Sequence, residues 1–118
     1  MPPITDAEAE ALLRPISEKL EHATYQTKDI DAMMAFYAPN AILASAGKTF
    51  YGLDEIRPPT VAYFAIADGT VLSDKRYSGT SELLILNGKF KNSVWQGQYE
   101  QIWKKYGDKY LLQYEHYF

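Results

Sequence analysis

The sequence predicts an α+β domain in which three N-terminal helices pack against a mostly antiparallel sheet of six strands. Before Val71, apolar residues recur mainly at helical spacing, and after it they alternate with polar residues as in half-buried strands. Short turn sequences containing Gly, Asn or Asp separate the alternating segments. Helices followed by strands are typical of a domain whose helices cover one face of a sheet.

The first helix begins at Thr5, where Thr5-Asp6-Ala7-Glu8 matches a capping box. An apolar stripe follows at three- and four-residue steps, which predicts a helix of about five turns. Pro15 lies inside this stripe, and because the stripe continues beyond it, we expect a bend rather than an end. The stripe consists of Ala9, Leu13, Ile16, Leu20 and Ala23.

A second, shorter helix is capped by Asp29 and is stopped by Pro39-Asn40. Its expected core residues are Ile30, Met33, Met34 and Tyr37. A hairpin of Ala41–Ala44 and Thr49–Tyr51 follows, joined by the Gly47-Lys48 turn. The third helix then runs from Leu53 to Asp68-Gly69, with Pro58-Pro59 interrupting it or opening its second segment.

Four longer strands complete the predicted sheet, and the sequence order suggests a six-stranded meander. They are Val71–Tyr77, Glu82–Phe90, Trp95–Trp103 and Tyr110–Tyr117.

Composition excludes several kinds of protein. The 118 residues are the length of one domain, so we expect residues 1–118 to fold as a single unit. A net charge of −3, with no basic run longer than the pairs Lys75-Arg76 and Lys104-Lys105, argues against nucleic acid as a partner. No apolar run approaches the ~20 residues of a membrane span, and Met1–Asp6 lacks the character of a signal peptide. We therefore expect a cytoplasmic protein, and the absence of Cys excludes disulfides and thiol chemistry.

Three motifs in this order carry a family resemblance. They are Asp29-x-x-x-Met33-x-x-x-Tyr37-Ala38-Pro39-Asn40-Ala41, then Phe50-Tyr51-Gly52-x-x-x-Ile56, and finally Gln101-Ile102-Trp103 with the Gly107-Asp108-Lys109-Tyr110 turn. With these motifs the chain resembles, from Thr5 to Tyr117, the nuclear transport factor 2-like superfamily, and in particular its small SnoaL-like (polyketide cyclase-like) members.

The resemblance implies a cone-shaped fold, in which a curved sheet wraps around three helices and leaves a pocket at its wide end. Members include steroid isomerases, polyketide cyclases, dehydratases and epoxide hydrolases, and also non-catalytic domains, so the fold alone does not imply a reaction. Many members pair through the outer face of the sheet. We therefore expect a homodimer formed through the sheet.

The steroid-isomerase mechanism is disfavoured when its residues are carried over position by position. The catalytic base position falls at about Ser45, and the helix Tyr of the oxyanion hole falls at about Glu21. A Ser without a nearby His or Lys cannot abstract a proton at neutral pH. The sheet position of the oxyanion hole falls near Gln101, whose amide could still donate a hydrogen bond.

Strand alternation supplies the candidate pocket residues. On the strand Trp95–Trp103, it places Tyr99, Gln101 and Trp103 on the same face. On the strand Tyr110–Tyr117, it places Gln113, Glu115 and Tyr117 on the same face. The resemblance implies that pocket residues lie at the positions of Gln101 and Tyr117, so all six are the expected ligand-binding residues. A register shifted by one would instead bring Glu100, Tyr114 and His116 into the pocket.

Glu115 is the best candidate for a catalytic residue. A carboxyl group among Tyr and Gln in an apolar cone would have a raised pKa and could act as an acid or base. The alternative is a rim residue in water or a structural hydrogen-bond acceptor. His22 and His116 have no further ligands at suitable spacing, so we expect no metal and no cofactor.

Taken together, these patterns indicate a small-molecule-binding domain with an aromatic, semi-polar pocket for a small apolar or carbonyl-bearing ligand. Two alternatives stay open. One is a cofactor-independent isomerase, dehydratase or hydrolase that uses Glu115 as acid/base, and the other is a structural homodimerisation module whose pocket is filled by its own aromatic side chains.

Overall fold

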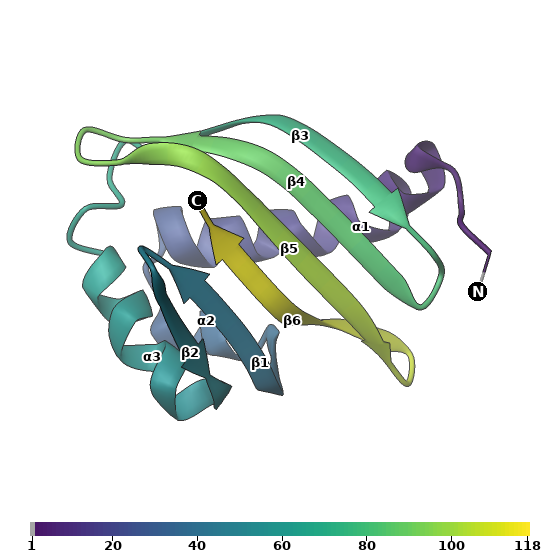
Figure 1. Cartoon of the computed structure of the whole chain (residues 1–118), viewed down its shortest axis with the longest axis horizontal. Coiled ribbons are helices and arrows are strands. Elements are labelled where there is room, and N and C mark those ends of the chain that lie inside the picture. Colours follow the sequence, from purple (N-terminus) through teal and green to yellow (C-terminus); the bar gives the residue numbers. More distant parts are fainter. Residues whose placement is uncertain (1) are drawn as a thin grey trace.

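A computed structural model describes residues 2–118 and confirms the α+β fold with a six-stranded, mostly antiparallel sheet (Figure 1). The helices are α1 (Asp6–Glu21), α2 (Ile30–Met34) and α3 (Gly52–Tyr63), and a π-helical turn, η1 (His22–Gln26), extends α1. The strands are β1 (Tyr37–Ser45), β2 (Lys48–Tyr51), β3 (Val71–Gly79), β4 (Leu83–Lys91), β5 (Gln96–Tyr106) and β6 (Lys109–Tyr117).

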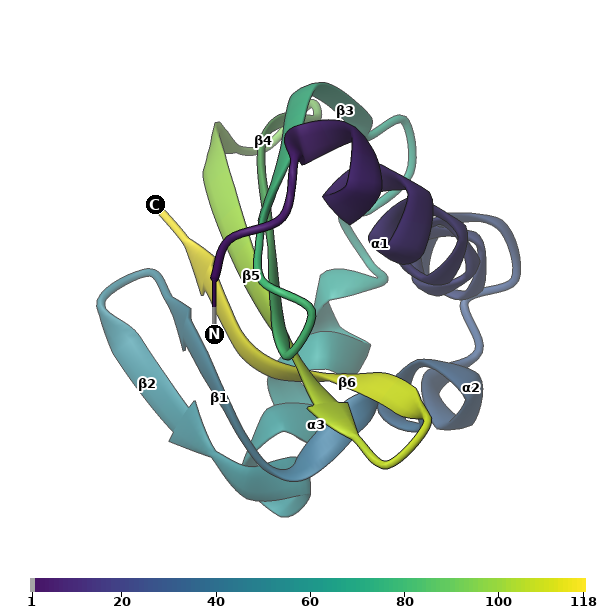
Figure 2. The ribbon, with the colours of Figure 1, turned by 90° about the vertical axis from the view of Figure 1, so that its right-hand side faces the viewer.

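The strand order is β2-β1-β6-β5-β4-β3, which corrects the predicted six-stranded meander. Strands β3 to β6 do form an antiparallel meander, but β1 joins the sheet beside β6 and runs parallel to it. The sheet is strongly curved, and α1 and α2 lie on one side of it (Figure 2). Because α1 packs on β3 and α3 packs on β1, helices cover both ends of the curved sheet.

The capping box predicted at the start of α1 is confirmed. The Glu8 amide donates to Thr5 Oγ1 (3.1 Å), and the Thr5 amide donates to Glu8 Oε1 (3.0 Å). These bonds satisfy two backbone donors that a helix start leaves without partners. The helix then presents Ala9, Leu13 and Leu20 to the core, where all three are buried.

The second helix is shorter than its apolar spacing predicts. It ends at Met34, and Tyr37 is the first residue of β1, not part of the helix. The cause is pairing with a strand distant in sequence, because the Leu112 amide donates to Phe36 O (2.7 Å) and Tyr37 lies opposite Leu112 in the sheet. A tertiary hydrogen-bond ladder therefore overrides the local helical pattern.

A group of fully buried side chains lies toward the β5–β6 hairpin, which we call the hairpin end of the sheet. Its centre is the fully buried Trp103, which meets Phe36 edge to face at 6.5 Å between ring centroids. Leu84 and Leu112, the cross-strand neighbours of Trp103, are also fully buried. Within residues 2–118, no helix has both the length and the apolar character that are needed to cross a membrane.

Candidate functional site

A cavity of about 370 Å³ lies between the sheet and the helices, at the opposite end of β5 and β6 from their hairpin. This volume is in the range of small-molecule sites, which are mostly apolar with a few placed polar groups. The cavity is lined by apolar and aromatic side chains (Leu20, Tyr25, Met33, Tyr37, Leu43, Phe50, Tyr63, Ile66, Leu72, Trp95, Tyr99, Tyr117), by polar or charged ones (Glu21, Thr24, Ser45, Lys48, Thr60, Gln101, Glu115) and by Ala46, Pro59 and Ala62.

Neighbouring positions on β5 and β6 supply the polar centre of the cavity. Tyr99 lies opposite Tyr117 and Gln101 lies opposite Glu115 in the antiparallel ladder. Side chains at alternate positions share one face of a strand, so all four point into the cavity. The structure thus brings together four of the six residues expected to bind a ligand, and their ligand-binding role stays a prediction.

Glu115 is the centre of a hydrogen-bond cluster. Its carboxylate accepts from the Tyr37 hydroxyl at Oε1 (2.5 Å), and from the Tyr117 hydroxyl and Gln101 Nε2 at Oε2 (2.9 Å each). Gln101 Oε1 accepts from the Trp103 indole N–H (3.1 Å). Because an indole N–H can only donate, this bond fixes the orientation of the Gln101 amide and directs its N–H₂ group at Glu115.

The surroundings of Glu115 raise its pKa above the usual value of a Glu side chain. Glu115 is only 3% exposed, and this burial is the largest cause of the raised pKa. The three hydrogen bonds from Tyr37, Tyr117 and Gln101 act in the opposite direction and lower it by less. Burial and the Glu115 charge together raise the pKa values of Tyr37 and Tyr117, so both stay protonated and can donate.

Tyr99 has no partner for its hydroxyl group. Among residues 2–118, its Oη is the one buried side-chain nitrogen or oxygen that makes no hydrogen bond. The ring lies against Gly88 of β4, where an added Cβ would come within 2.7 Å of the Tyr99 Cζ and Oη atoms. Gly88 therefore provides the space that the Tyr99 phenol group occupies over β4. Burial raises the pKa of Tyr99, so this hydroxyl keeps its proton.

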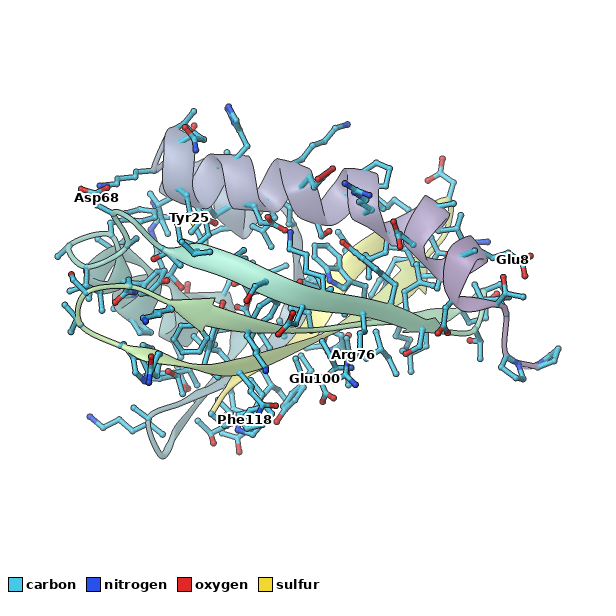
Figure 3. The ribbon with its side chains drawn as sticks, turned by 90° about the horizontal axis from the view of Figure 1, so that it is seen from above. Glu8, Tyr25, Asp68, Arg76, Glu100 and Phe118 are labelled. Carbon is cyan, nitrogen blue, oxygen red and sulfur yellow. The ribbon has the colours of Figure 1, made fainter. Side chains whose placement is uncertain are left out.

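The π-helical turn η1 delivers Thr24 and Tyr25 to the cavity wall. Turns of this kind are rare and occur often at functional sites. Figure 3 shows Tyr25 between α1 and the strands. The Tyr25 hydroxyl lies 3.1 Å from that of Tyr63, which in turn lies 3.4 Å from Thr70 Oγ1. Two aromatic side chains from different helices are thereby joined at the wall.

Two residues expected to bind a ligand lie outside the cavity. Trp103 points inward but is fully buried in the core, where it supports Gln101. Gln113 lies toward the hairpin end, where it accepts from the Tyr106 hydroxyl and donates to Asn40 O and Oδ1 (3.2 Å each). The cause is a β-bulge in β6.

The bulge shifts the alternation of β6 by one residue. Ile102 lies opposite Tyr114, whereas the next residue, Trp103, lies opposite Leu112, so Gln113 is an extra residue without a cross-strand partner. Leu112 replaces it in the core and is fully buried. Strict alternation from Glu115 back to Gln113 is therefore the wrong pattern for this strand.

The register shifted by one does not occur in the structure. Glu100, Tyr114 and His116 are absent from the cavity wall. Figure 3 shows Glu100 on the side of the sheet that faces away from α1. His116 lies beside Phe118, with 4.6 Å between ring centroids, in a row with Tyr114. These side chains belong to the outer face of the sheet.

Three Tyr residues of the site were not among the expected site residues. Tyr37 was assigned to a helix, and Tyr25 and Tyr63 lie on helices whose cavity-facing positions depend on the π turn and on the packing of α3. The excess of Tyr in the composition was the one available signal. Ser45, at the position of the steroid-isomerase base, lines the cavity. Glu21, at the position of the helix Tyr of those enzymes, lines it as well.

The site offers no metal-binding cluster. Within residues 2–118, no group of three or more His, Cys, Asp or Glu side chains is placed to hold a metal ion. Glu21 is paired with Lys75 (2.8 Å from Nζ to each carboxylate oxygen). The side chains at the cavity wall supply hydrogen-bonding groups and, at Glu115, a carboxyl that can exchange a proton.

Solved structures share this arrangement of helices and strands. A protein of unknown function from Pseudomonas putida, described as NTF2-like, superposes with a TM-score of 0.79, and the match covers 97% of this chain and 87% of that one at 15% identity. The chain adopts the nuclear transport factor 2-like fold. A proposed ketosteroid isomerase from Shewanella frigidimarina shares this fold at a TM-score of 0.77 and 15% identity, over 88% of this chain and 92% of that one.

A third structure extends the comparison to a protein described by a different fold name. It is a protein of unknown function with a cystatin-like fold from Nostoc punctiforme, with a TM-score of 0.77, 15% identity and coverage of 94% of this chain and 90% of that one. No protein-family model matches the sequence, and no curated protein matches it significantly. At these identities the nuclear transport factor 2-like proteins share a fold with this chain, and the fold hosts many functions.

Proposed function

We propose that the protein binds a small, largely apolar molecule in the cavity. The observation that carries this proposal is the open space of about 370 Å³ within a wall that is mainly apolar and aromatic. Apolar contacts with Phe50, Trp95 and Leu72 would stabilise such a ligand. Gln101 and Glu115 supply polar groups at the same wall.

The open cavity also favours binding over a purely structural role. A module that served only for dimerisation would have its pocket filled by its own aromatic side chains, whereas here about 370 Å³ stays open. Lys48 contributes a cation to the lining, but Glu115 is buried deep within it. A buried carboxyl disfavours an anionic ligand beside it, so the proposed ligand is neutral.

Native mass spectrometry of protein purified directly from cells tests the proposal. We expect a bound molecule whose mass is lost on denaturation, together with a change in Trp95 fluorescence when camphor, a compact bicyclic ketone, is titrated into the ligand-free protein. Leu72→Phe, which narrows the cavity, should weaken both signals. Leu83→Phe is the matched control, because Leu83 is exposed on β4 outside the cavity. A protein that carries no molecule and does not respond to camphor would contradict the proposal.

A second candidate function is proton transfer by Glu115, as in a cofactor-independent isomerase, dehydratase or hydrolase. The observation in its favour is a buried carboxyl at the cavity wall whose pKa burial raises, since such groups serve as general acids and bases. Tyr99, Gln101 and Tyr117 would position the substrate. An ionised carboxylate has about four acceptor positions, and three are filled, so one is left for a substrate proton.

Deuterium exchange tests this second candidate without knowledge of the substrate. If Glu115 acts as a base, the protein in D₂O should speed exchange of the protons next to the camphor carbonyl, measured by proton NMR. Glu115→Gln should abolish the acceleration, while Glu100→Gln on the outer face should leave it unchanged. Equal exchange rates with and without protein would leave binding as the function.

We also propose that two copies of the chain pair through the outer face of the sheet. An unbroken row of apolar and aromatic side chains crosses this face from strand to strand, at positions that lie opposite one another in the ladder. The row consists of Tyr51, Ile42, Tyr114, Ile102 and Ile85. In a two-fold interface the same surface is used by both copies, so a row of this kind can pack on itself.

Charges beside the row are self-complementary. Arg76 and Glu100 both lie opposite Asn87 in the ladder, and Figure 3 shows both on the side away from α1. Neither forms an ion pair with another of the residues 2–118. Sedimentation equilibrium should give a dimer that Arg76→Glu or Glu100→Arg weakens and that the double exchange restores. A wild-type monomer at every concentration would contradict the pairing.

A further inference from the structure

The hydrogen-bond donors around Glu115 are arranged for a carboxylate. The Trp103 indole N–H donates to Gln101 Oε1 (3.1 Å), so the Gln101 amide presents its N–H₂ group to Glu115 Oε2 (2.9 Å). The hydroxyl groups of Tyr37 and Tyr117 donate to Oε1 and Oε2 (2.5 and 2.9 Å). Three donors that converge on one carboxyl group stabilise its ionised form.

No basic side chain of residues 2–118 neutralises Glu115, because none of their ion pairs includes it. Lys48, the one basic residue among the described residues of the cavity wall, is exposed on β2. The second acidic residue of the wall, Glu21, has its own cation in Lys75 (2.8 Å from Nζ to each carboxylate oxygen). Buried acidic side chains are normally paired with a cation. Glu115 therefore has the donors that an anion needs but lacks a counter-ion.

Aromatic rings line the wall beside this carboxyl group. Tyr117, which donates to Glu115, lies 6.1 Å from Trp95 between ring centroids, and both side chains line the cavity. On the helical side of the cavity, Tyr25 and Tyr63 form a second pair at 6.2 Å. Proteins use such rings to recognise ammonium groups, because the face of a ring attracts a cation. The wall thus combines two kinds of group that favour a positive charge.

We infer that the molecule bound in the cavity is a lipophilic amine, whose ammonium group is the missing counter-ion of Glu115. This inference rests on the proposed binding function and names its ligand class. The amine is neutral as the free base, and its nitrogen takes the proton of the Glu115 carboxyl group, so one N–H bond forms as one O–H bond breaks. The two charges attract each other through a wall of low polarity, so the ammonium group need not displace the three hydrogen bonds of the carboxylate.

This proton exchange gives the binding a defined pH dependence. Glu115 holds its proton to a higher pH than an ordinary Glu, because burial raises its pKa, whereas an alkyl amine in water is an ammonium ion below about pH 10. Binding of the ammonium ion to the protonated site therefore releases one proton, and the affinity should rise about tenfold per pH unit until Glu115 ionises by itself. The other titratable side chains of the wall are Glu21 from α1, Tyr25 from η1, Tyr37 from β1, Lys48 from β2, Tyr63 from α3, Tyr99 from β5 and Tyr117 from β6.

Two molecules with one carbon skeleton test the charge. Bornylamine carries an amino group and borneol carries a hydroxyl group at the same carbon. Isothermal titration calorimetry of the ligand-free protein at pH 8 should show bornylamine binding roughly tenfold tighter than borneol, because hydrogen bonds to charged groups are stronger than neutral ones by about this factor. Between pH 8 and pH 4, the affinity for bornylamine should fall, and the affinity for borneol should not.

Two variants that each remove one negative charge separate a local effect from a general one. Glu115→Gln removes the counter-ion, so bornylamine should bind no better than borneol, and its affinity should no longer change with pH. Glu100→Gln removes the same charge from the outer face of the sheet, away from the cavity, and should keep both the preference and its pH dependence.

The outcomes distinguish the inference from the proposed function. Borneol binding as tightly as bornylamine, an amine affinity that does not change with pH, or a preference that survives in Glu115→Gln would overturn the amine assignment and leave small-molecule binding intact. No response to bornylamine, borneol or camphor would overturn the proposed function, and the inference with it. Circular dichroism identifies a variant that fails to fold, and in that case the preference of the wild type and its pH dependence decide.

Discussion

The two ends of strands β5 and β6 use similar residues for opposite purposes. At the hairpin end, Trp103 is fully buried, and the Tyr110 hydroxyl donates to Ser81 O (2.5 Å). At the cavity end, Trp95 is only half-buried, and the Tyr99 hydroxyl is buried with no partner. The polar side chains are thus satisfied at the hairpin end, whereas the unsatisfied one lies at the end where the cavity opens.

The bulge at Gln113 separates these two ends. On one side of it β6 contributes Leu112 to a dry core, and on the other it contributes Glu115 and Tyr117 to the cavity. Bulges re-aim side chains and occur often beside active sites. Here one extra residue lets a single strand supply both an apolar and a polar surface.

The largest expected difference between the ends concerns their two Trp residues. Trp103→Ala should lower the free energy of unfolding by about 3–5 kcal/mol, because it opens a cavity in the core and removes the donor to Gln101. Trp95→Ala should cost much less, since its ring is half-exposed at the cavity wall. Urea denaturation followed by circular dichroism gives both values. Equal losses would mean that the cavity end is packed as tightly as the hairpin end.

The next effect concerns the space that Gly88 leaves for Tyr99. Gly88→Ala places a methyl group within 2.7 Å of the phenol ring and should cost about 1–3 kcal/mol, since overpacking forces a buried side chain to move. Ligand binding should fall with it, because the displaced ring forms part of the cavity wall. Gly107→Ala in the β5–β6 turn has open space around its Cβ but a φ of +65°, so it should lower stability through backbone strain and leave binding intact. Normal binding by Gly88→Ala would contradict this role of the Tyr99 ring.

An effect of intermediate size concerns pH. Because the pKa of Glu115 is raised in the folded state, the folded protein holds this proton more tightly than the unfolded chain does. Stability from this group is therefore complete below the usual Glu range and is lost as pH rises toward the raised pKa, by at most about 1.4 kcal/mol per pH unit. Glu115→Gln should remove this fall, as measured by urea denaturation between pH 4 and pH 8. Parallel curves for the variant and the wild type would contradict it.

The smallest effects come from removing single hydroxyl groups. Tyr110→Phe deletes a made hydrogen bond and should cost about 1 kcal/mol. Tyr99→Phe deletes a hydroxyl that has no partner, so it should leave the stability unchanged or raise it slightly. Thermal unfolding of the ligand-free proteins measures both. A loss in Tyr99→Phe equal to that in Tyr110→Phe would show that Tyr99 has a partner in solution.

The sequence predicted the parts of this molecule that depend on local patterns. The capping box at Thr5, the alternation that places Tyr99 and Gln101 on one face, and the order of helices and strands need only nearby residues. The bulge at Gln113 and the helix end before Tyr37 depend on strands distant in sequence, so no local pattern reveals them. The contact between the Tyr25 and Tyr63 hydroxyls depends on the π-helical turn and the packing of α3, which follow only from the folded chain.

The parallel pairing of β1 with β6 has a consequence for the order of folding. Tyr37 and Glu115 lie 78 positions apart in the sequence, and Leu43, six positions nearer, pairs with Glu115 in the sheet. Closing so long a loop costs conformational entropy before any contact repays it, and such non-local pairings slow folding. Strands β3 to β6 can pair through short turns, so we expect the meander to form first. In a stopped-flow refolding experiment, competence to bind a ligand should return only in the slowest phase.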